Sequence, residues 1–184
     1  VTLPEGIPLS VVIDRVVKDT ELTRADVVAA VENPAVLGLP PYARNRPEGF
    51  LFPATYDVEP GTAAVDALRQ MTEKFAEVAA GLDLESRARA LGLTPYQVVI
   101  IASIIEDETA VDADRPKVAR VVLNRLARGM PLQLDSTVNY VRTQKKARLT
   151  LADIAVESPY NTYAHTGLPP TPIDSPGEKA LDAA

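Results

Sequence analysis

The stretch that decides the fold is Thr94-Pro95-Tyr96-Gln97-Val98-Val99-Ile100-Ile101-Ala102-Ser103-Ile104-Ile105-Glu106-Asp107-Glu108-Thr109. Thr94 is a favourable N-cap, Pro95 suits the first helical position, and Gln97 completes a capping box with Thr94. Every residue from Val98 to Ile105 except Ser103 is apolar. The β-branched run is also compatible with a buried strand, but the capping box favours a helix. A helix that is apolar on all sides is buried on all sides, so this stretch predicts a buried central helix.

Three acidic residues lie at the end of this predicted helix. At about 100° per residue, Glu106 and Glu108 flank the main apolar face and Asp107 points the opposite way. We expect both glutamates to be partly desolvated, and burial raises the pKa of a carboxyl group. A carboxyl with a raised pKa is suited to general acid catalysis at neutral pH. The alternative is that these acids pair with arginines such as Arg115 or Arg120 and only stabilise the helix end.

Composition excludes several classes of protein. The chain has 184 residues and 46% hydrophobic residues, which is typical of a globular protein with a sizeable core. Its net charge of −6 argues against a nucleic-acid binder. The absence of cysteine excludes disulfides and thiolate zinc sites, and a single histidine, His165, excludes a multi-histidine metal site. We therefore expect neither a metal nor a cofactor.

No apolar run is long enough to cross a membrane, and no signal peptide is visible. The chain starts at Val1 without a methionine and ends in the helix-like segment Glu178–Ala184. Both ends look cut, so we expect a membrane anchor or another domain to lie outside this chain.

The rest of the chain predicts a mixed fold. Residues 48–58 are rich in aromatic residues and are expected to be extended, with Pro53 limiting them to a sheet edge or a break. Helical spacing recurs in ranges 10–18, 23–32, 62–78 and 84–91 and again after Asp112. We therefore predict an α+β fold, with a small strand-containing N-terminal part over residues 1–47. A mostly helical catalytic domain over residues 48–184 surrounds the central helix.

Two polar segments follow the predicted helices. Residues 157–172 form a long loop rich in hydroxyls, amides and prolines, which suits sugar recognition because tyrosine rings stack on sugars and amides bond hydroxyls. The alternative is a connector whose polar groups only satisfy the backbone. Residues 142–148 are basic, and we interpret them as a solvated surface loop.

Five ordered motifs resemble those of one known family. They are Glu48-Gly49-Phe50-Leu51-Phe52-Pro53-Ala54-Thr55-Tyr56, Ala102-Ser103-Ile104-Ile105-Glu106-Asp107-Glu108-Thr109-Ala110, Val121-Val122-Leu123-Asn124-Arg125-Leu126, Leu132-Gln133-Leu134-Asp135-Ser136-Thr137-Val138, and Tyr160-Asn161-Thr162-Tyr163 with Gly167-Leu168-Pro169-Pro170. Together they resemble the endolytic murein transglycosylases, the MltG or YceG-like family.

The resemblance implies a bacterial lyase, anchored in the cytoplasmic membrane and acting on its extracytoplasmic face. Its substrate is peptidoglycan, in which it cleaves the β-1,4 bond between N-acetylmuramic acid and N-acetylglucosamine of nascent strands, leaving 1,6-anhydro ends. Peptidoglycan synthases are possible partners, and nucleic acid is not expected. Residues 1–47 look like the end of a LysM-like region. The family's usual C-terminal segment, which follows the proline-rich loop, is absent here.

The resemblance also implies roles for individual residues. Glu108 matches the family's catalytic acid, a single glutamate that serves first as general acid and then as base. Glu106 is the alternative acid, and Asp135 is a supporting acid. The substrate-binding residues would be Asn124, Gln133, Ser136, Thr137, Tyr160, Asn161, Thr162 and Tyr163. We expect Glu108, Gln133, Asp135, Asn161 and Tyr163 to line one cleft.

Two other functions remain open at this point. Some relatives carry the label aminodeoxychorismate lyase, a pyridoxal-phosphate enzyme, which needs a Schiff-base lysine and a phosphate cradle. Lysines such as Lys117 and Lys145 have no glycine-rich partner, which argues against that chemistry. The other alternative is a non-catalytic glycan-binding or scaffold module.

Overall fold

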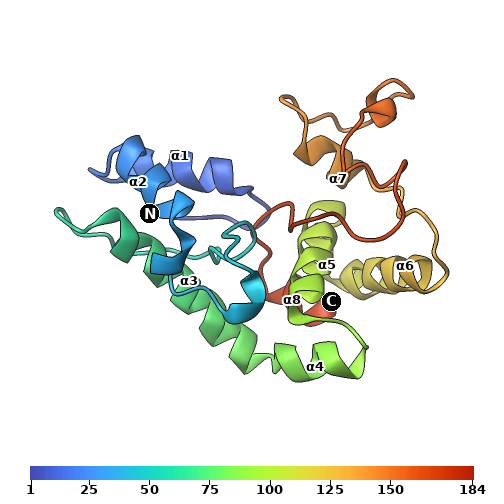
Figure 1. The fold of residues 1–184 in the computed structure, drawn as a ribbon, viewed down its shortest axis with the longest axis horizontal. Coiled ribbons are helices and arrows are strands. Elements are labelled where there is room, and N and C mark those ends of the chain that lie inside the picture. The colour runs from blue at the N-terminus through green and yellow to red at the C-terminus, as the bar shows by residue number, and fades with distance from the viewer.

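The computed structural model describes residues 1–184 and is built from α-helices joined by loops (Figure 1). The helices are α1 (Leu9–Asp19), α2 (Arg24–Glu32), α3 (Ala64–Gly81), α4 (Leu84–Ala90), α5 (Pro95–Glu108), α6 (Arg115–Ala127), α7 (Asp135–Tyr140) and α8 (Glu178–Ala183). Short 3-10 turns lie at Pro34–Val36, Pro41–Ala43, Asp112–Asp114 and Asp153–Ala155.

The predicted central helix is confirmed as α5. Thr94 and Gln97 form the complete capping box, and every residue from Val98 to Ile105 is buried. Helices α4, α6, α7 and α8 all contact α5, which explains why it is apolar on every side. The one polar side chain between Val98 and Ile105 is satisfied, because Ser103 Oγ donates to the Ile100 carbonyl at 2.8 Å and accepts the Ile173 N–H at 3.0 Å.

The predicted α+β class is wrong, because the structure contains no β-strand. Residues 48–58 form turns, bends and irregular backbone, and the single bridge among them is that of Thr55. The N-terminal segment makes only isolated bridges, Thr2 with Thr55 and Ile7 with Ser175. The aromatic side chains that suggested a strand instead insert between helices, where the Phe50 ring lies 4.8 Å from that of Phe75.

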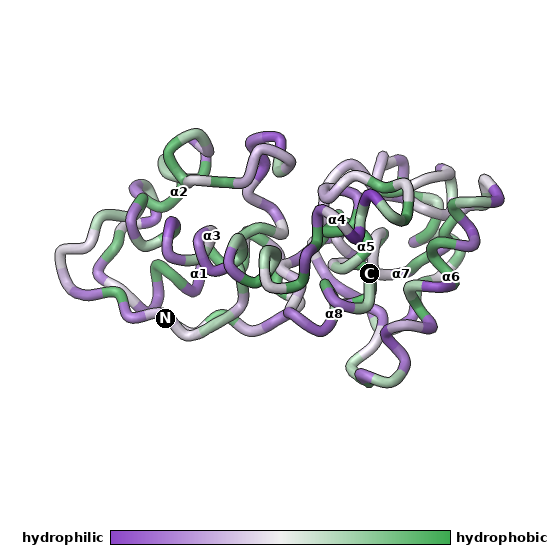
Figure 2. Tube along the Cα trace, turned by 90° about the horizontal axis from the view of Figure 1, so that it is seen from below, coloured by the Kyte–Doolittle hydropathy of each residue, from purple (hydrophilic) through white to green (hydrophobic).

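Two hydrophobic cores lie along an elongated molecule, seen in side view in Figure 2. One is built mainly from α1, α2 and the first half of α3. The other surrounds α5 and takes in the second half of α3 together with α4, α6 and α8. Helix α3 therefore belongs to both cores.

The predicted domain boundary between residues 47 and 48 stays a prediction. No single helix is long and apolar enough to cross a membrane, and only the pair α4 and α5, bent by 96°, passes that test together.

A buried strap, residues 171–177, joins the two halves. It runs between α5 and the N-terminal segment before it enters α8 (Figure 1). Gly6 N–H donates to the Ser175 carbonyl at 3.0 Å, and Ser175 N–H donates to the Ile7 carbonyl at 2.9 Å. Gly49 packs against the strap with φ +84°, and a Cβ atom at this glycine would lie 2.5 Å from Pro172 Cβ.

Candidate active site

A polar cleft of about 530 Å³ opens where α5 ends and α7 begins. Its lining comes from the last turn of α5, the segment leading into α7, α7 itself, the basic segment after α7 and the loop after residue 160. The lining residues are Asp107, Glu108, Gln133, Asp135, Ser136, Asn139, Lys145, Lys146, Ala147 and Tyr163. Four of the five residues expected in one cleft, Glu108, Gln133, Asp135 and Tyr163, therefore lie together.

Glu108 is the last residue of α5, and its carboxylate faces the cleft. The buried Ser136 hydroxyl, from the first turn of α7, donates to Glu108 Oε1 at 2.7 Å. The expectation that Glu108 is partly desolvated is wrong, because the residue is exposed at the open end of its helix. A bound substrate, rather than the protein core, would have to exclude water from this carboxylate.

Asp135 and Tyr163 form a second polar pair in the cleft. The Tyr163 hydroxyl donates to Asp135 Oδ1 at 2.6 Å. Burial, followed by this hydrogen bond and by the negative charges of Asp135 and Glu108, raises the pKa of Tyr163 to about 12. The phenol is therefore protonated at neutral pH and acts as a donor.

Gln133 projects from the segment that leads into α7. It has φ +54°, in the left-handed region that non-glycine residues rarely occupy, and such strained positions cluster at functional sites. The Gln133 N–H donates to the Thr162 carbonyl at 2.9 Å. The exposed side-chain amide is left free to meet a ligand in the cleft.

Several residues of the predicted substrate-binding set instead hold the cleft together. Thr137 and Thr162 are buried, and their hydroxyls bond each other at 2.8 Å. Asn161 is 1% exposed and does not line the cleft. Its Nδ2 donates to the carbonyls of Ile154 and Val156 at 2.9 and 2.8 Å, so it shapes the loop that carries Tyr163.

The other two members of the set lie apart from the cleft lining. The Tyr160 hydroxyl bonds Thr171 Oγ1 at 2.8 Å, and its ring packs 4.8 Å from that of Tyr140. Asn124 is exposed on α6.

Glu106 does not line the cleft and instead joins three elements. Its side chain is 7% exposed, and Oε1 accepts from Arg115 Nη2 at 3.0 Å, with the Arg115 side chain 5% exposed. Glu106 Oε2 accepts the Gly177 N–H at 2.9 Å, so one carboxylate links α5, α6 and the start of α8. The pairing with an arginine that we considered for these acids is therefore confirmed for Glu106.

Sequence reasoning missed five cleft residues: Asp107, Asn139, Lys145, Lys146 and Ala147. Three of them follow α7, in or next to the basic segment that we interpreted as a solvated loop. Lys145 Nζ lies 3.5 Å from Asp107 Oδ1, which brings this segment against the end of α5. The density of cations was the only sequence signal, and it did not indicate which way the segment faces.

Two further carboxyl groups are buried outside the cleft. Burial raises the pKa of Glu48 to about 7, although Leu9 N–H and the Tyr140 hydroxyl each donate to it at 2.9 Å. Asp174, in the strap, is 1% exposed, and neither carboxyl oxygen has a hydrogen-bond partner. Burial, with the charges of Asp107, Glu106 and Glu48, holds the pKa of Asp174 well above its usual range.

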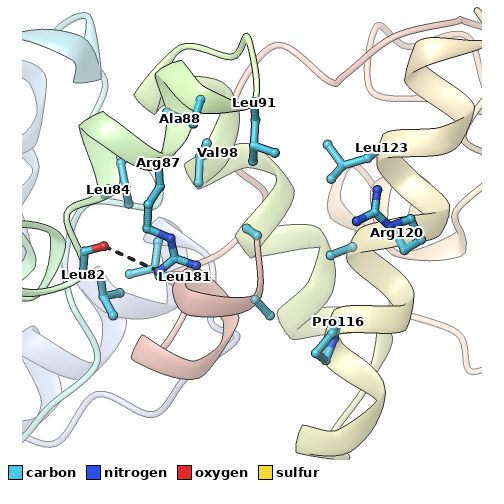
Figure 3. A pocket seen from close by; sticks show the side chains of 14 residues that line it. Leu82, Leu84, Arg87, Ala88, Leu91, Val98, Pro116, Arg120, Leu123 and Leu181 are labelled. Carbon is cyan, nitrogen blue, oxygen red and sulfur yellow. Dashed lines mark hydrogen bonds between the residues drawn. The ribbon is translucent and has the colours of Figure 1, made fainter.

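A second hollow, of about 370 Å³, lies between α4, α5, α6 and α8 and is mostly apolar (Figure 3). Val98 and Leu181 are part of its wall, and the guanidinium groups of Arg87 and Arg120 lie beside it. It contains no carboxylate, so it offers no group for acid–base chemistry. No group of three or more metal-ligating side chains is gathered in the structure.

The geometry suits proton transfer to a polar ligand. The exposed Glu108 carboxyl is held by Ser136, and the acceptor Asp135 and donor Tyr163 lie in the same cleft. A polar, open cleft of this size accommodates hydroxyl-rich substrates better than apolar ones.

Comparison with known proteins gives consistent matches. The model of the YceG-like family matches residues 1–184. An endolytic murein transglycosylase of Bacillus subtilis (strain 168) is 32% identical over 202 residues, covering 100% of this chain and 55% of that protein. One of Streptococcus pneumoniae (strain ATCC BAA-255 / R6) is 36% identical over 148 residues, covering 77% of this chain and 26% of that protein.

A solved structure agrees with these matches. The crystal structure of a yceG-like protein of Listeria monocytogenes superposes with a TM-score of 0.86 at 32% identity, covering 100% of this chain and 65% of that one. The chain thus spans about half the length of the Bacillus relative and about a quarter of the streptococcal one.

Proposed function

Because this chain belongs to the YceG-like family, we propose that it carries the catalytic cleft of an endolytic murein transglycosylase. Its relatives named as such enzymes support this proposal. The observation that carries it is the Glu108 carboxylate, exposed in a polar cleft and held by the Ser136 hydroxyl at 2.7 Å. The proposed substrate is peptidoglycan, cut inside its glycan strands.

In the proposed mechanism, one carboxyl group performs both proton transfers. Protonated Glu108 first gives its proton to the glycosidic oxygen as the bond from C1 of N-acetylmuramic acid to that oxygen breaks. The resulting carboxylate then takes the proton of the muramic C6 hydroxyl, whose oxygen bonds to C1 and closes the 1,6-anhydro ring. No water is consumed, and Glu108 ends protonated. Ordinary glycosidases instead use two carboxyl groups and a water molecule.

The neighbours of Glu108 have supporting roles in this scheme. Ser136 fixes one carboxylate oxygen and leaves the other free to reach the substrate. Asp135 holds the Tyr163 hydroxyl in place, and the Gln133 amide is available for sugar hydroxyls or acetamido groups. Glu106 keeps a structural role, because both of its oxygens are already engaged.

The proposed substrate also determines where in the cell the protein would act. Peptidoglycan strands lie outside the cytoplasmic membrane, so we place this cleft on the extracytoplasmic face. A membrane anchor would lie elsewhere in the protein, and contacts with peptidoglycan synthases would bring the cleft to nascent strands. Neither is required for the chemistry at Glu108.

Glu108→Gln in the full-length protein tests the proposal. Glutamine keeps the shape of the side chain but cannot act as a general acid, so we expect an intact fold and complete loss of anhydro ends. The assay is digestion of purified glycan strands, with the new ends identified by mass spectrometry. Glu106→Gln is the matched control and should lower the melting temperature while anhydro ends still form.

Three outcomes would contradict the proposal. Anhydro product from folded Glu108→Gln but not from Glu106→Gln would transfer the acid role to Glu106. Product from both variants would remove the single-carboxyl mechanism. Strand binding by the wild-type protein without any product would favour a non-catalytic glycan-binding module.

A further inference from the structure

The cleft carries charges of both signs. Asp107, Glu108 and Asp135 supply three carboxylates, and Lys145 and Lys146 supply two ammonium groups. The sugars of a glycan backbone offer hydroxyl and acetamido groups, which need hydrogen bonds but no cation. The lysines therefore point to an anionic substituent on whatever occupies the cleft.

The basic segment that carries these lysines is an exposed loop, as expected, but its backbone is also hydrogen-bonded to α7. Asn139, on α7, donates from Nδ2 to the Lys146 carbonyl at 2.9 Å, and its Oδ1 accepts the Lys146 N–H at 3.0 Å. These two hydrogen bonds hold the backbone next to Lys145 against α7, the helix that also carries Asp135 and Ser136.

Side chains of the basic segment reinforce this attachment. Lys146 Nζ bonds both carboxylate oxygens of Asp153 at 2.9 Å, and Arg142 Nη1 lies 2.8 Å from Asp153 Oδ1. The Lys146 ammonium, followed by Thr150 and Arg142, holds the pKa of Asp153 well below its usual range. The charges of Lys146 and Arg142 are therefore already paired with Asp153.

Lys145 is the cleft cation that remains available. Its side chain is 49% exposed, and its one ionic contact is with Asp107 Oδ1 at 3.5 Å, a distance at the limit of a hydrogen bond. The contact spans the cleft lining from the basic segment to the end of α5. A ligand carboxylate could replace Asp107 as the partner of Lys145 without disturbing the fold.

Resting on the function proposed above, we infer that Lys145 binds a carboxylate of the peptide stems that branch from the muramic acids of peptidoglycan. These stems are the part of the substrate that carries negative charge beside the scissile sugar. The cleft would therefore prefer strands with ionised stems over strands whose stem carboxylates are neutral. Lys145 acts here on substrate binding, not on the proton transfers at Glu108, so its effect should fall on KM and leave kcat unchanged.

The test compares two matched substrates with the full-length protein. One is uncrosslinked strands with free stem carboxylates, and the other is the same strands after chemical amidation of those carboxylates. Lys145→Gln should raise KM about fivefold on the free-carboxylate strands and leave KM on the amidated strands unchanged. Lys145→Arg, which keeps the charge, should remain close to wild type.

Lys117→Gln is the matched control, because Lys117 is a 75% exposed lysine that pairs with Asp114 away from the cleft. It should change neither KM. Raising the salt concentration should reduce the preference of the wild-type protein for charged stems, because salt screens exposed ion pairs.

A binding measurement separates this inference from the proposed function. Affinity of the two kinds of strand for the Glu108→Gln protein, with and without Lys145→Gln, reports the charge preference without any cleavage. Equal binding of free and amidated strands, or an equal loss on both with Lys145→Gln, would overturn the inference. Absence of anhydro product from the wild-type protein, with the charge preference intact, would overturn the proposed function alone.

Discussion

Replacing Glu106 with glutamine is expected to destabilise the protein strongly, because this carboxylate neutralises a buried cation. Burial opposes the charge of Arg115, but the hydrogen bond and charge of Glu106, together with Asp112, more than offset it and raise the pKa of Arg115. Arginine does not lose its proton in proteins, so the guanidinium stays charged in the variant as well. One of its nitrogens, Nη1, already lacks a partner, so losing Glu106 leaves a buried charge poorly compensated.

The size of the effect follows from the surroundings of the pair. Removing one partner of a buried ion pair costs about 3–5 kcal/mol. Glutamine can still accept the Gly177 N–H, and the exposed Asp112 carboxylate still bonds Arg115 Nε at 3.2 Å, so we expect the lower end, about 3 kcal/mol. For a chain of this length, that corresponds to a melting temperature lower by roughly 6–12 °C.

Thermal and urea unfolding followed by circular dichroism at pH 7 would measure this loss. Glu108→Gln is the matched control, since it makes the same chemical change two residues away on the same helix but at an exposed position. Its free energy of unfolding should change by less than about 0.5 kcal/mol. Equal melting temperatures for the two variants would refute the view that Glu106 and Arg115 form a stabilising buried pair.

Two further predictions concern the buried acid Glu48 and the contact of Gly49 with the strap. The pKa of Glu48 is raised from 4.5 to about 7 in the folded protein, so its contribution to stability is fully present below pH 4.5 and is lost as the pH rises through 7. In wild type, this group should lower the free energy of unfolding by about 3 kcal/mol between pH 4.5 and pH 8, and Glu48→Gln should abolish that decrease. Equal pH dependence of the unfolding free energy in the two proteins would contradict this prediction. Gly49→Ala should destabilise by about 2–4 kcal/mol, because it combines a left-handed φ with a clash against Pro172. Gly61→Ala, with φ +87° but no atom within 4 Å, should show the smaller cost of the backbone alone, and equal losses would rule out the clash.

Local signals in the sequence predicted the central helix well. Thr94, Pro95 and Gln97 specify a helix start through bonds within four residues, so no knowledge of the tertiary fold was needed. The strand prediction failed because a strand depends on a partner. Residues 48–58 carry the aromatic side chains typical of a strand, but the N-terminal segment pairs with them only around one bridge, Thr2 with Thr55.

The site was predictable in part for the same reason. The resemblance named Glu108, Gln133, Asp135 and Tyr163, and all four line the cleft, although their chemical roles remain predictions. Asn161 suggested sugar binding by residue type, but its amide bonds two backbone carbonyls, and a sequence does not show which polar groups the backbone has already engaged. The direction in which Lys145 points depends on the hydrogen bonds between the Asn139 side chain and the Lys146 backbone, which require α7 to be formed.

The strap that passes between the two cores has a consequence for the order of folding. Ser175 pairs with Ile7, so the strap, which is synthesised after helices α1 to α7, completes contacts with a segment that is synthesised before all of them. Closing so long a loop is entropically costly and slows folding, because the chain must be ordered before the contact forms. Until the strap arrives, the apolar residues of α5 would lack part of their cover during synthesis. We therefore expect nascent chains that stop before residue 171 to need chaperones, and docking of the strap to be a slow, late step in refolding.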